Sequence, residues 1–299
     1  MTRSVLPRFP IYIISKGRHE TIALHTAGFL SYDHVPYRVV VEPQEFDDYA
    51  KVLPEEKLLV TPFSNLGQGS IPARNFVWQH ALSQGAEWHW ILDDNIRRIY
   101  RLWKGDRIPC DSAPAFRQCE DFTLRFKNVA LSGMNYKMFG LPNLSAYFIN
   151  SHVYSCLLIR NDLPNRWRGR YNEDTDLCLQ VLGDGHCTVL VNVFLADKLP
   201  SMTMKGGNTD ELYLNDGRLE MAQSLERNWP GVVTVDRRWQ RPQHVVDWRR
   251  FKQPLIQKEG LPELPAIDEY GLKLYPMQKP KSPQIVKVLQ DYWREHAEV

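Results

Sequence analysis

The first hundred residues alternate short apolar runs with amphipathic segments, and this alternation constrains the fold more than any other feature. The order is strand, helix, strand, short helix, strand, helix, strand, at residues 11–15, 19–30, 37–41, 44–52, 58–61, 73–83 and 88–92. Such a pattern is typical of successive β-α-β units with right-handed crossovers. It predicts an α/β fold of the Rossmann-like type, with a mostly parallel central sheet and helices on both faces.

Polar side chains follow the expected strands at the points where these strands end. They are Ser15, Lys16 and Arg18 after the first strand, Glu42 after the second, and Asp93, Asp94 and Asn95 after the fourth. In open parallel sheets, ligands bind at the carboxyl ends of the strands. We therefore expect these side chains to line one binding site.

Beyond residue 100 the pattern is less regular. We expect a loop at 104–120, helices at 122–131, 173–181 and 217–228, and strands at 155–159 and 188–193. Proline is frequent after residue 253, before a last expected helix at 283–296. These patterns predict a domain at 1–252, with a nucleotide-binding half (1–100) and an acceptor-binding half (101–252), and a Pro-rich C-terminal extension at 253–299.

Two bulk features narrow the class of protein. The five cysteines include no C-x-x-C pair, which favours reduced thiols over a disulfide framework or a zinc site. No window approaches the roughly 18 consecutive apolar residues of a membrane span, and Arg3 and Pro7 come too early for the apolar region of a secretory signal. We expect an intracellular protein that does not associate with membranes.

Two acidic clusters indicate the chemistry. Asp93 and Asp94 end a strand, whereas Glu173 and Asp174 begin an expected helix. Acids at strand ends are common, and capping alone could explain acids at a helix start. Together, however, the clusters suit glycosyl transfer, in which a cation held by one or two carboxylates neutralises a diphosphate leaving group. A second carboxylate takes the proton of the acceptor hydroxyl, and Asp174 is the candidate base.

Two glycine-containing segments are candidates for contact with the diphosphate. Gly67 and Gly69 precede Arg74 and Asn75 on the first turn of an expected helix, without the lysine of a P-loop. Lys205 and Gly206 form the second segment, where an ammonium group and backbone amides can approach a phosphate. Ordinary turns are the plain alternative in both places.

Basic residues are concentrated late in the chain. Residues 227–258 carry eight Lys and Arg against two Asp, a balance of +6, whereas the whole chain has a net charge of +2. Arginine alternating with tryptophan, as at Arg238, Trp239 and Arg241, is typical of segments that bind phosphates and stack on bases. Arg168 and Arg170 form a second candidate DNA-binding patch, although a solvated basic face remains the simpler reading of each.

Several motifs occurring together resemble the TET-associated glycosyltransferases of bacteriophages, which are relatives of the GT-A superfamily. They lie at residues 11–18, 73–75, 91–95, 128–136 and 172–177. The resemblance implies a UDP-sugar donor, a divalent metal (Mn or Mg), and DNA containing 5-hydroxymethylcytosine or a related 5-hydroxymethylpyrimidine as acceptor. It also implies an upstream TET-like dioxygenase that makes the hydroxymethyl group, and a cytoplasmic location in the infected bacterial host.

The resemblance implies roles for individual residues. Donor contacts fall on Ser15, Lys16, Arg18, Glu42, Arg74 and Asn75, with Asp93 within reach of the ribose. Catalysis falls on Asp174 with its neighbour Glu173, and metal binding falls on Asp94, Asn95 and His244. Most GT-A enzymes have Asp where this chain has Asn95, and a neutral amide binds cations more weakly.

Other functions are consistent with the same residues. A GT-A enzyme could act on a polysaccharide or a protein, a non-catalytic relative could bind DNA alone, and a glycoside hydrolase also uses paired carboxylates. Acceptor affinity that falls steeply with salt would favour DNA. If Asp174 is the base, a single displacement with inversion is expected. The sequence leaves the donated sugar and the oligomeric state open.

Overall fold

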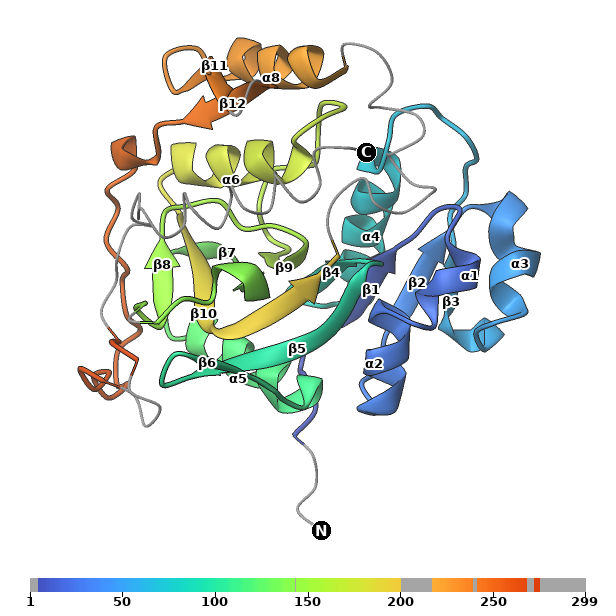
Figure 1. Ribbon diagram of the computed structural model, residues 1–299, viewed down its shortest axis with the longest axis horizontal. Helices are drawn as coiled ribbons and strands as arrows, with labels where there is room; N and C mark the ends of the chain where they lie inside the picture. The colour runs from blue at the N-terminus through green and yellow to red at the C-terminus, as the bar shows by residue number, and fades with distance from the viewer. Residues whose placement is uncertain (1–4, 143, 200–216, 239–240, 268–271, 275–299) are drawn as a thin grey trace.

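The first half of the central sheet is parallel, as predicted. The computed structural model describes residues 5–142, 144–199, 217–238, 241–267 and 272–274 (Figure 1). Its first four strands are β1 (Ile11–Ile14), β2 (Arg38–Val41), β3 (Leu58–Val60) and β4 (Trp88–Asp93). They lie in the order β3-β2-β1-β4, and all three pairings are parallel. The apolar runs of β1, β2 and β4 are largely buried, as both faces of a parallel sheet require, whereas the edge strand β3 leaves Val60 exposed.

The second half of the sheet is mixed. Its strands are β5 (Ile96–Trp103), β6 (Asp106–Pro109), β7 (Val129–Tyr136), β8 (Tyr147–Ile149), β9 (Cys156–Arg160) and β10 (Cys187–Lys198). The sheet continues from β4 in the order β9-β7-β10-β5-β6, with β8 on β10. Strand β9 is antiparallel to both β4 and β7, whereas β10 is parallel to β7. The two predicted halves thus share one sheet, and their division at residue 100 stays a prediction.

One region of the secondary structure was predicted wrongly. The expected loop at 104–120 contains β6 and most of helix α5 (Ser112–Thr123). The expected helix at 122–131 instead covers the last two residues of α5, a turn and the start of β7. Pro114 lies in the first turn of α5, where a missing N–H costs no hydrogen bond. Strand β7 is buried almost throughout, so its sequence lacks the alternation that marks a half-buried strand.

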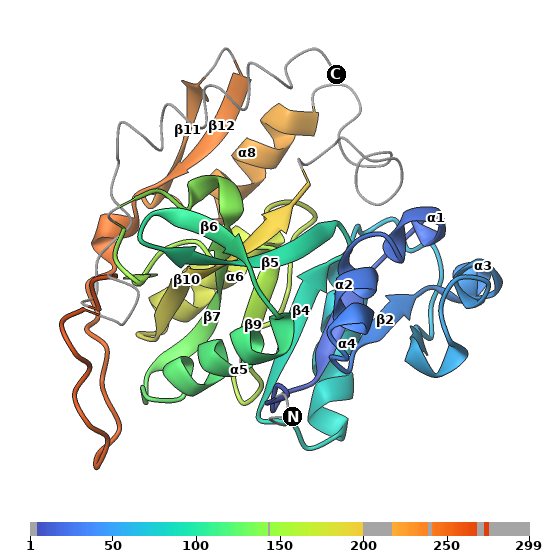
Figure 2. The same cartoon turned by 60° about the horizontal axis from the view of Figure 1, so that its bottom comes forward.

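Helices cover both faces of the sheet, as predicted (Figures 1 and 2). Helices α2 (Thr26–Tyr32) and α5 pack together on one face, and α4 (Ile71–Ser83) and α6 (Glu173–Gly183) lie on the other. The expected helix at 19–30 is two helices, with α1 (His19–Ile22) preceding α2, and α3 (Phe46–Ala50) lies beside β3. Beyond α6 lie α8 (Gly217–Asn228) and a hairpin of β11 (Val233–Arg238) and β12 (Arg241–Val246).

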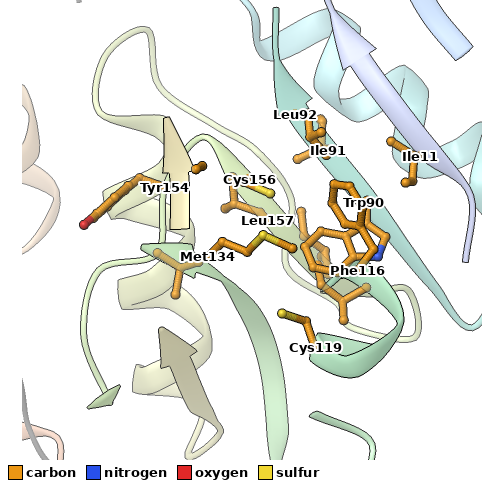
Figure 3. Close-up of a cluster of buried hydrophobic side chains, with 14 of the residues drawn as sticks. Ile11, Trp90, Ile91, Leu92, Phe116, Cys119, Met134, Tyr154, Cys156 and Leu157 are labelled. Carbon is orange, nitrogen blue, oxygen red and sulfur yellow. The ribbon is translucent and has the colours of Figure 1, made fainter. Parts of the chain in front are cut away.

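The core that supports the sheet lies between its central strands and α5 (Figure 3). Trp90 of β4 meets Phe116 of α5 edge to face, with ring centroids 4.8 Å apart. Gly133 of β7 allows the closest approach in this core, since an added Cβ would lie 2.2 Å from the carbonyl oxygen of Cys156. Each fully buried large apolar side chain contributes about 1.5–3 kcal/mol. The core therefore fixes β4 and β9, whose ends carry the polar residues described below.

Residues 256–258 of the Pro-rich C-terminal segment pack along the α5–β7 connection. The Lys127 N–H donates to the carbonyl of Ile256, and the Lys258 N–H donates to the carbonyl of Arg125. The expected helix at 283–296 lies outside the described residues. All five cysteines are free thiols, as predicted. Among the described residues, no helix has the length and apolar character needed to cross a membrane.

Candidate active site

The turn after β4 is held from two sides. The Thr26 hydroxyl, on the first turn of α2, donates to the carbonyl of Asp93 (2.7 Å) and accepts from the Ile96 N–H (2.9 Å). The Asp93 N–H donates to the carbonyl of Ser155 (2.9 Å), at the start of β9. The side chains of Asp93, Asp94 and Asn95 are therefore placed on a fixed backbone.

Asp93 lies among cationic and hydroxyl groups. Its Oδ1 accepts a hydrogen bond from Arg74 Nη2 (3.2 Å), and its Oδ2 accepts one from the Ser155 hydroxyl (2.7 Å). Lys198 Nζ, at the end of β10, is 3.7 Å from Oδ2. The Asp93 side chain is 26% exposed, so it remains accessible to a ligand.

Arg74 joins the two acidic clusters. Besides contacting Asp93, its Nε lies 3.1 Å from Ser70 Oγ and 3.5 Å from Glu173 Oε1. The guanidinium stacks over the ring of Trp167, 4.7 Å from the centroid, and the side chain is only 8% exposed. The acids near residues 93 and 173, distant in sequence, therefore meet around one buried cation.

The first turn of α6 presents Glu173 and Asp174 in different environments. Burial raises the pKa of Glu173, an effect that Arg74 opposes. Burial acts in the same direction on Asp174, but His152 and Arg74 outweigh it and hold the pKa of Asp174 well below its usual range. The contact responsible is short, since His152 Nε2 lies 3.1 Å from Asp174 Oδ2. Adjacent groups whose pKa values are driven apart are typical of acid–base sites.

Asp94 points away from this cluster, toward the end of β1. Its Oδ1 pairs with Arg18 Nη1 at 2.5 Å, and its Oδ2 accepts from the Ser15 hydroxyl at 2.8 Å. Tyr49 completes the chain: its hydroxyl lies 2.6 Å from Ser15 Oγ and accepts from the Arg18 N–H. Burial raises the pKa of Asp94, and Arg18 opposes that shift. Asp94 thus orients the β1 loop.

The end of β2 carries Glu42, as predicted. Both of its carboxylate oxygens lie 3.4 Å from Lys16 Nζ, and Oε2 also accepts from the Asn65 N–H and the Gln44 amide. Burial acts to raise the pKa of Glu42, but these donors and Lys16 outweigh it and lower the pKa. Lys16, Arg18 and Glu42 therefore form a charged border at the ends of β1 and β2.

The three predicted metal ligands have different surroundings. Both Asp94 oxygens are already engaged, whereas Asn95 Oδ1 is buried without a hydrogen-bond partner in the described structure. His244 of β12 interacts electrostatically with His152 and Asp174, and burial lowers its pKa to about 4. No group of three His, Cys, Asp or Glu side chains in the described part of the chain could enclose a metal. Asp93 also accepts hydrogen bonds on both oxygens, but its side chain is 26% exposed, against 4% for Asp94. The Asp93 carboxylate and the Asn95 Oδ1 therefore fit a hard cation that takes most of its ligands from a bound diphosphate and water.

Two predicted binding residues have structural partners. The Asn75 amide accepts from the Trp167 N–H (3.1 Å) and donates to the Trp167 carbonyl (2.8 Å), which holds the segment before α6 against α4. Arg168 makes a two-pronged contact with Asp176 at 2.9 and 3.2 Å, although its side chain remains 53% exposed. Arg170 is exposed beside Tyr171.

Lys205, Gly206 and Trp239 lie outside the described residues. Arg238 and Arg241 pair with each other across the β11–β12 hairpin at the level of the backbone. Their roles in donor and DNA binding stay predictions.

Sequence reasoning missed three site residues: His152, Ser155 and Lys198. Ser155 and Lys198 lie at the ends of strands that border Asp93, and knowledge of the strand order would have been needed to select them. His152 lies between β8 and β9, 22 positions before Asp174. Its one sequence signal is a titratable ring within an otherwise apolar and hydroxyl-bearing stretch.

Comparisons with known proteins bear on this site. A family model for TET-Associated Glycosyltransferase matches residues 9–207. Among solved structures, the chain is similar to a candidate nucleotide-diphospho-sugar transferase from Desulfovibrio desulfuricans G20, with 10% sequence identity and a TM-score of 0.38, covering 62% of this chain and 80% of that chain. A search of curated proteins gave no match. The family match includes Asp93, Arg74 and both acids at the start of α6.

Proposed function

The chain belongs to the TET-associated glycosyltransferase family, and on that basis we propose that it transfers a sugar from a UDP-sugar to the hydroxyl of 5-hydroxymethylcytosine, or a related 5-hydroxymethylpyrimidine, in phage DNA. Membership establishes the glycosyltransferase activity. The donor nucleotide, the acceptor base and the roles of individual residues are the parts that we propose.

One observation carries the proposal: Arg74 brings the Asp93 cluster and the Glu173–Asp174 cluster together at the carboxyl end of β4. A glycosyltransferase needs cationic stabilisation of the departing diphosphate and proton removal from the acceptor on the opposite face of the sugar. Arg74 and Lys198 supply positive charge beside Asp93, and the charge of Arg74 also acts on Asp174. Both requirements are met within one group of contacts.

The donor is placed along the ends of the parallel strands. Lys16, Arg18 and Glu42 border the ends of β1 and β2, where nucleotides bind in sheets of this kind. Asp93 can accept hydrogen bonds from ribose or sugar hydroxyls, since its carboxylate is partly exposed. Attack by the acceptor oxygen on the anomeric carbon, opposite the diphosphate, inverts the configuration at that carbon.

A divalent cation such as Mn²⁺ or Mg²⁺ would be held by Asp93 and Asn95 together with the donor phosphates. It would neutralise charge on the leaving diphosphate. Because this protein offers one carboxylate and one amide, we expect weak binding of the cation in the absence of donor and tighter binding in its presence. Calorimetric titration of Mn²⁺ with and without UDP measures that difference, and equal affinities would contradict it.

The acceptor proposal is supported by exposed basic residues near Asp174. Arg168 and Arg170 precede α6, and Arg249 and Arg250 follow His152's stacking partner Trp248. A hydroxymethyl group on C5 of a pyrimidine projects into the major groove, so its hydroxyl is accessible in duplex DNA. Phosphate contacts from these arginines would position that groove over the site.

The test is mass spectrometry of nucleosides after hydroxymethylated DNA is incubated with a panel of UDP-sugars and Mn²⁺. We expect a new glycosylated nucleoside with the wild-type protein, a loss of at least a hundredfold with Asp174→Asn, and no product on unmodified DNA. Asp176→Asn is the matched control, because Asp176 lies two residues further along α6 and contacts Arg168 and Trp229. UDP release with a polysaccharide or protein acceptor, but never with DNA, would refute the proposal that DNA is the acceptor.

A further inference from the structure

The turn between β8 and β9 is fixed on both sides. The Ser151 N–H donates to Thr188 Oγ1 (2.9 Å), and that hydroxyl donates back to the Ser151 carbonyl (2.7 Å). The Val153 N–H donates to the Cys178 sulfur (3.3 Å) on α6. Residue 152 is therefore held between β10 and α6, through Cys178, which lies about one helical turn after Asp174.

His152 is the exception to the burial of its surroundings. Residues 150–151 and 153–159 are all buried, whereas the His152 side chain is 28% exposed. Its ring lies parallel to that of Trp248 (9° between planes, centroids 6.1 Å apart) and meets the Tyr154 ring at 71° (4.9 Å). The aromatic neighbours fix the plane of a ring that still reaches solvent.

Contacts to the ring assign its two nitrogens. Nε2 lies 3.1 Å from Asp174 Oδ2 and 3.2 Å from Thr175 Oγ1. A carboxylate only accepts hydrogen bonds, so the proton of the neutral ring belongs on Nε2, and Nδ1 is left as an acceptor. Within the described residues, no group hydrogen-bonds to Nδ1. A carboxylate that orients an imidazole in this way also stabilises the imidazolium once it forms.

The charges around the ring favour histidine over aspartate as the proton acceptor. Arg74 and the hydrogen bond from His152 Nε2 both favour the ionised form of Asp174 and act to lower its pKa, and that hydrogen bond also occupies Asp174 Oδ2. Asp174 is therefore a poor proton acceptor. Among the described residues, His244 of β12 and Tyr154 are the other titratable groups that interact with His152. Burial lowers the pKa of His244 to about 4 and raises that of Tyr154, so both are neutral near pH 7. Asp174 is thus the charged partner of the ring.

We propose that His152 is the proton acceptor of the transfer reaction and that Asp174 is its orienting partner. This inference rests on the proposed function. As the acceptor hydroxyl oxygen bonds to the anomeric carbon, its proton moves to His152 Nδ1. The bond between that carbon and the phosphate oxygen breaks, and its electron pair leaves with UDP. The imidazolium then gives its proton to water.

The experiment compares His152→Gln with His186→Gln, since His186 lies in the turn between α6 and β10. Glutamine keeps a donor for Asp174 but cannot accept a proton near neutral pH. We expect His152→Gln to lower kcat by 10²- to 10⁴-fold, with KM for the UDP-sugar within threefold of wild type. His186→Gln should retain wild-type values. A UDP titration and the thermal midpoint of each variant confirm that it is folded.

The pH profile distinguishes a catalytic role from a structural one. The wild-type kcat should rise with pH as the imidazolium deprotonates, and His152→Gln should lack this limb. Imidazole in the buffer should partly restore His152→Ala. Retention of kcat within threefold in His152→Gln, or an unchanged acidic limb, would overturn the proposal.

Failure of the acceptor assignment can be recognised separately. Glycosyltransferases release UDP slowly by transfer to water, and that reaction also requires loss of a proton from the attacking oxygen. If the wild-type protein releases UDP but does not modify DNA, the proposed acceptor is wrong. The rate of UDP-sugar hydrolysis then tests His152: a large loss in His152→Gln supports its role as proton acceptor, and an unchanged rate contradicts it.

Discussion

Replacing Arg74 by methionine tests whether this residue is the electrostatic link between the two acidic clusters. Methionine keeps most of the side-chain volume against Trp167 but leaves Asp93 and Glu173 without their shared cation. Because Arg74 is 8% exposed and Glu173 14%, solvent screens the pair weakly. Removing one partner of such a buried ion pair costs about 3–5 kcal/mol. Urea unfolding measured at neutral pH should show a loss of that size.

The same substitution has a predictable pH dependence. Burial raises the pKa of Glu173, and loss of Arg74 should raise it further above the unfolded value. A carboxyl with a raised pKa in the folded state binds protons there more readily than in the unfolded chain, so stability falls as pH rises between the unfolded and folded pKa values. The deficit of Arg74→Met should therefore be smallest below about pH 4 and largest near neutrality.

A double-mutant cycle completes this test. Adding Glu173→Gln to Arg74→Met should recover roughly 0.5–3 kcal/mol and remove much of the pH dependence. Glu173→Gln alone is the matched control, because it keeps an acceptor for Ser70. A loss below about 1 kcal/mol in Arg74→Met, with no coupling to residue 173, would show that the two clusters are not linked through this guanidinium.

Three further substitutions separate structural residues from functional ones. Asp176→Asn weakens charge-assisted bonds from Arg168 and Trp229, so the free energy of unfolding should fall by about 1.5–3 kcal/mol while kcat stays near wild type; a large loss of kcat in folded protein would contradict this assignment. Asn75→Ala removes both hydrogen bonds to the Trp167 backbone and should cost about 2 kcal/mol in urea unfolding, whereas an unchanged midpoint would show that Asn75 does not hold this segment. Arg170→Ala should reduce the slope of log KM for DNA against log salt by about 1 without altering KM for the donor, and an unchanged slope would remove Arg170 from the DNA contact.

The parallel half of the fold was predictable because each of its strands is a short apolar run that ends in polar residues. Asp93 and Glu42 were identified only from this change from apolar to polar residues, and both lie at strand ends in the structure. The first three residues of β7 were assigned to a helix because burial of both its faces removes the period of two. The strand order of the second half depends on long-range pairing, which local sequence patterns do not contain.

The hydrogen-bond partners of the candidate site residues could not be read from the sequence. The Asn75 amide nitrogen and oxygen both bond to the backbone of Trp167, 92 positions away. Asp94 faces Arg18, whereas its neighbour Asp93 faces Arg74. These choices depend on which side of a turn each side chain leaves the backbone. His152 could not be selected because its function depends on a contact with α6 that only folding creates.

The most direct measurement is a crystal structure of the Asp174→Asn variant with an intact UDP-sugar. Our account predicts that the diphosphate lies beside Asp93, Arg74 and Lys198 and that the anomeric carbon faces residue 174 and the His152 ring. A nucleotide bound elsewhere, or a sugar pointing away from α6, would contradict the claim that these two clusters form one active site.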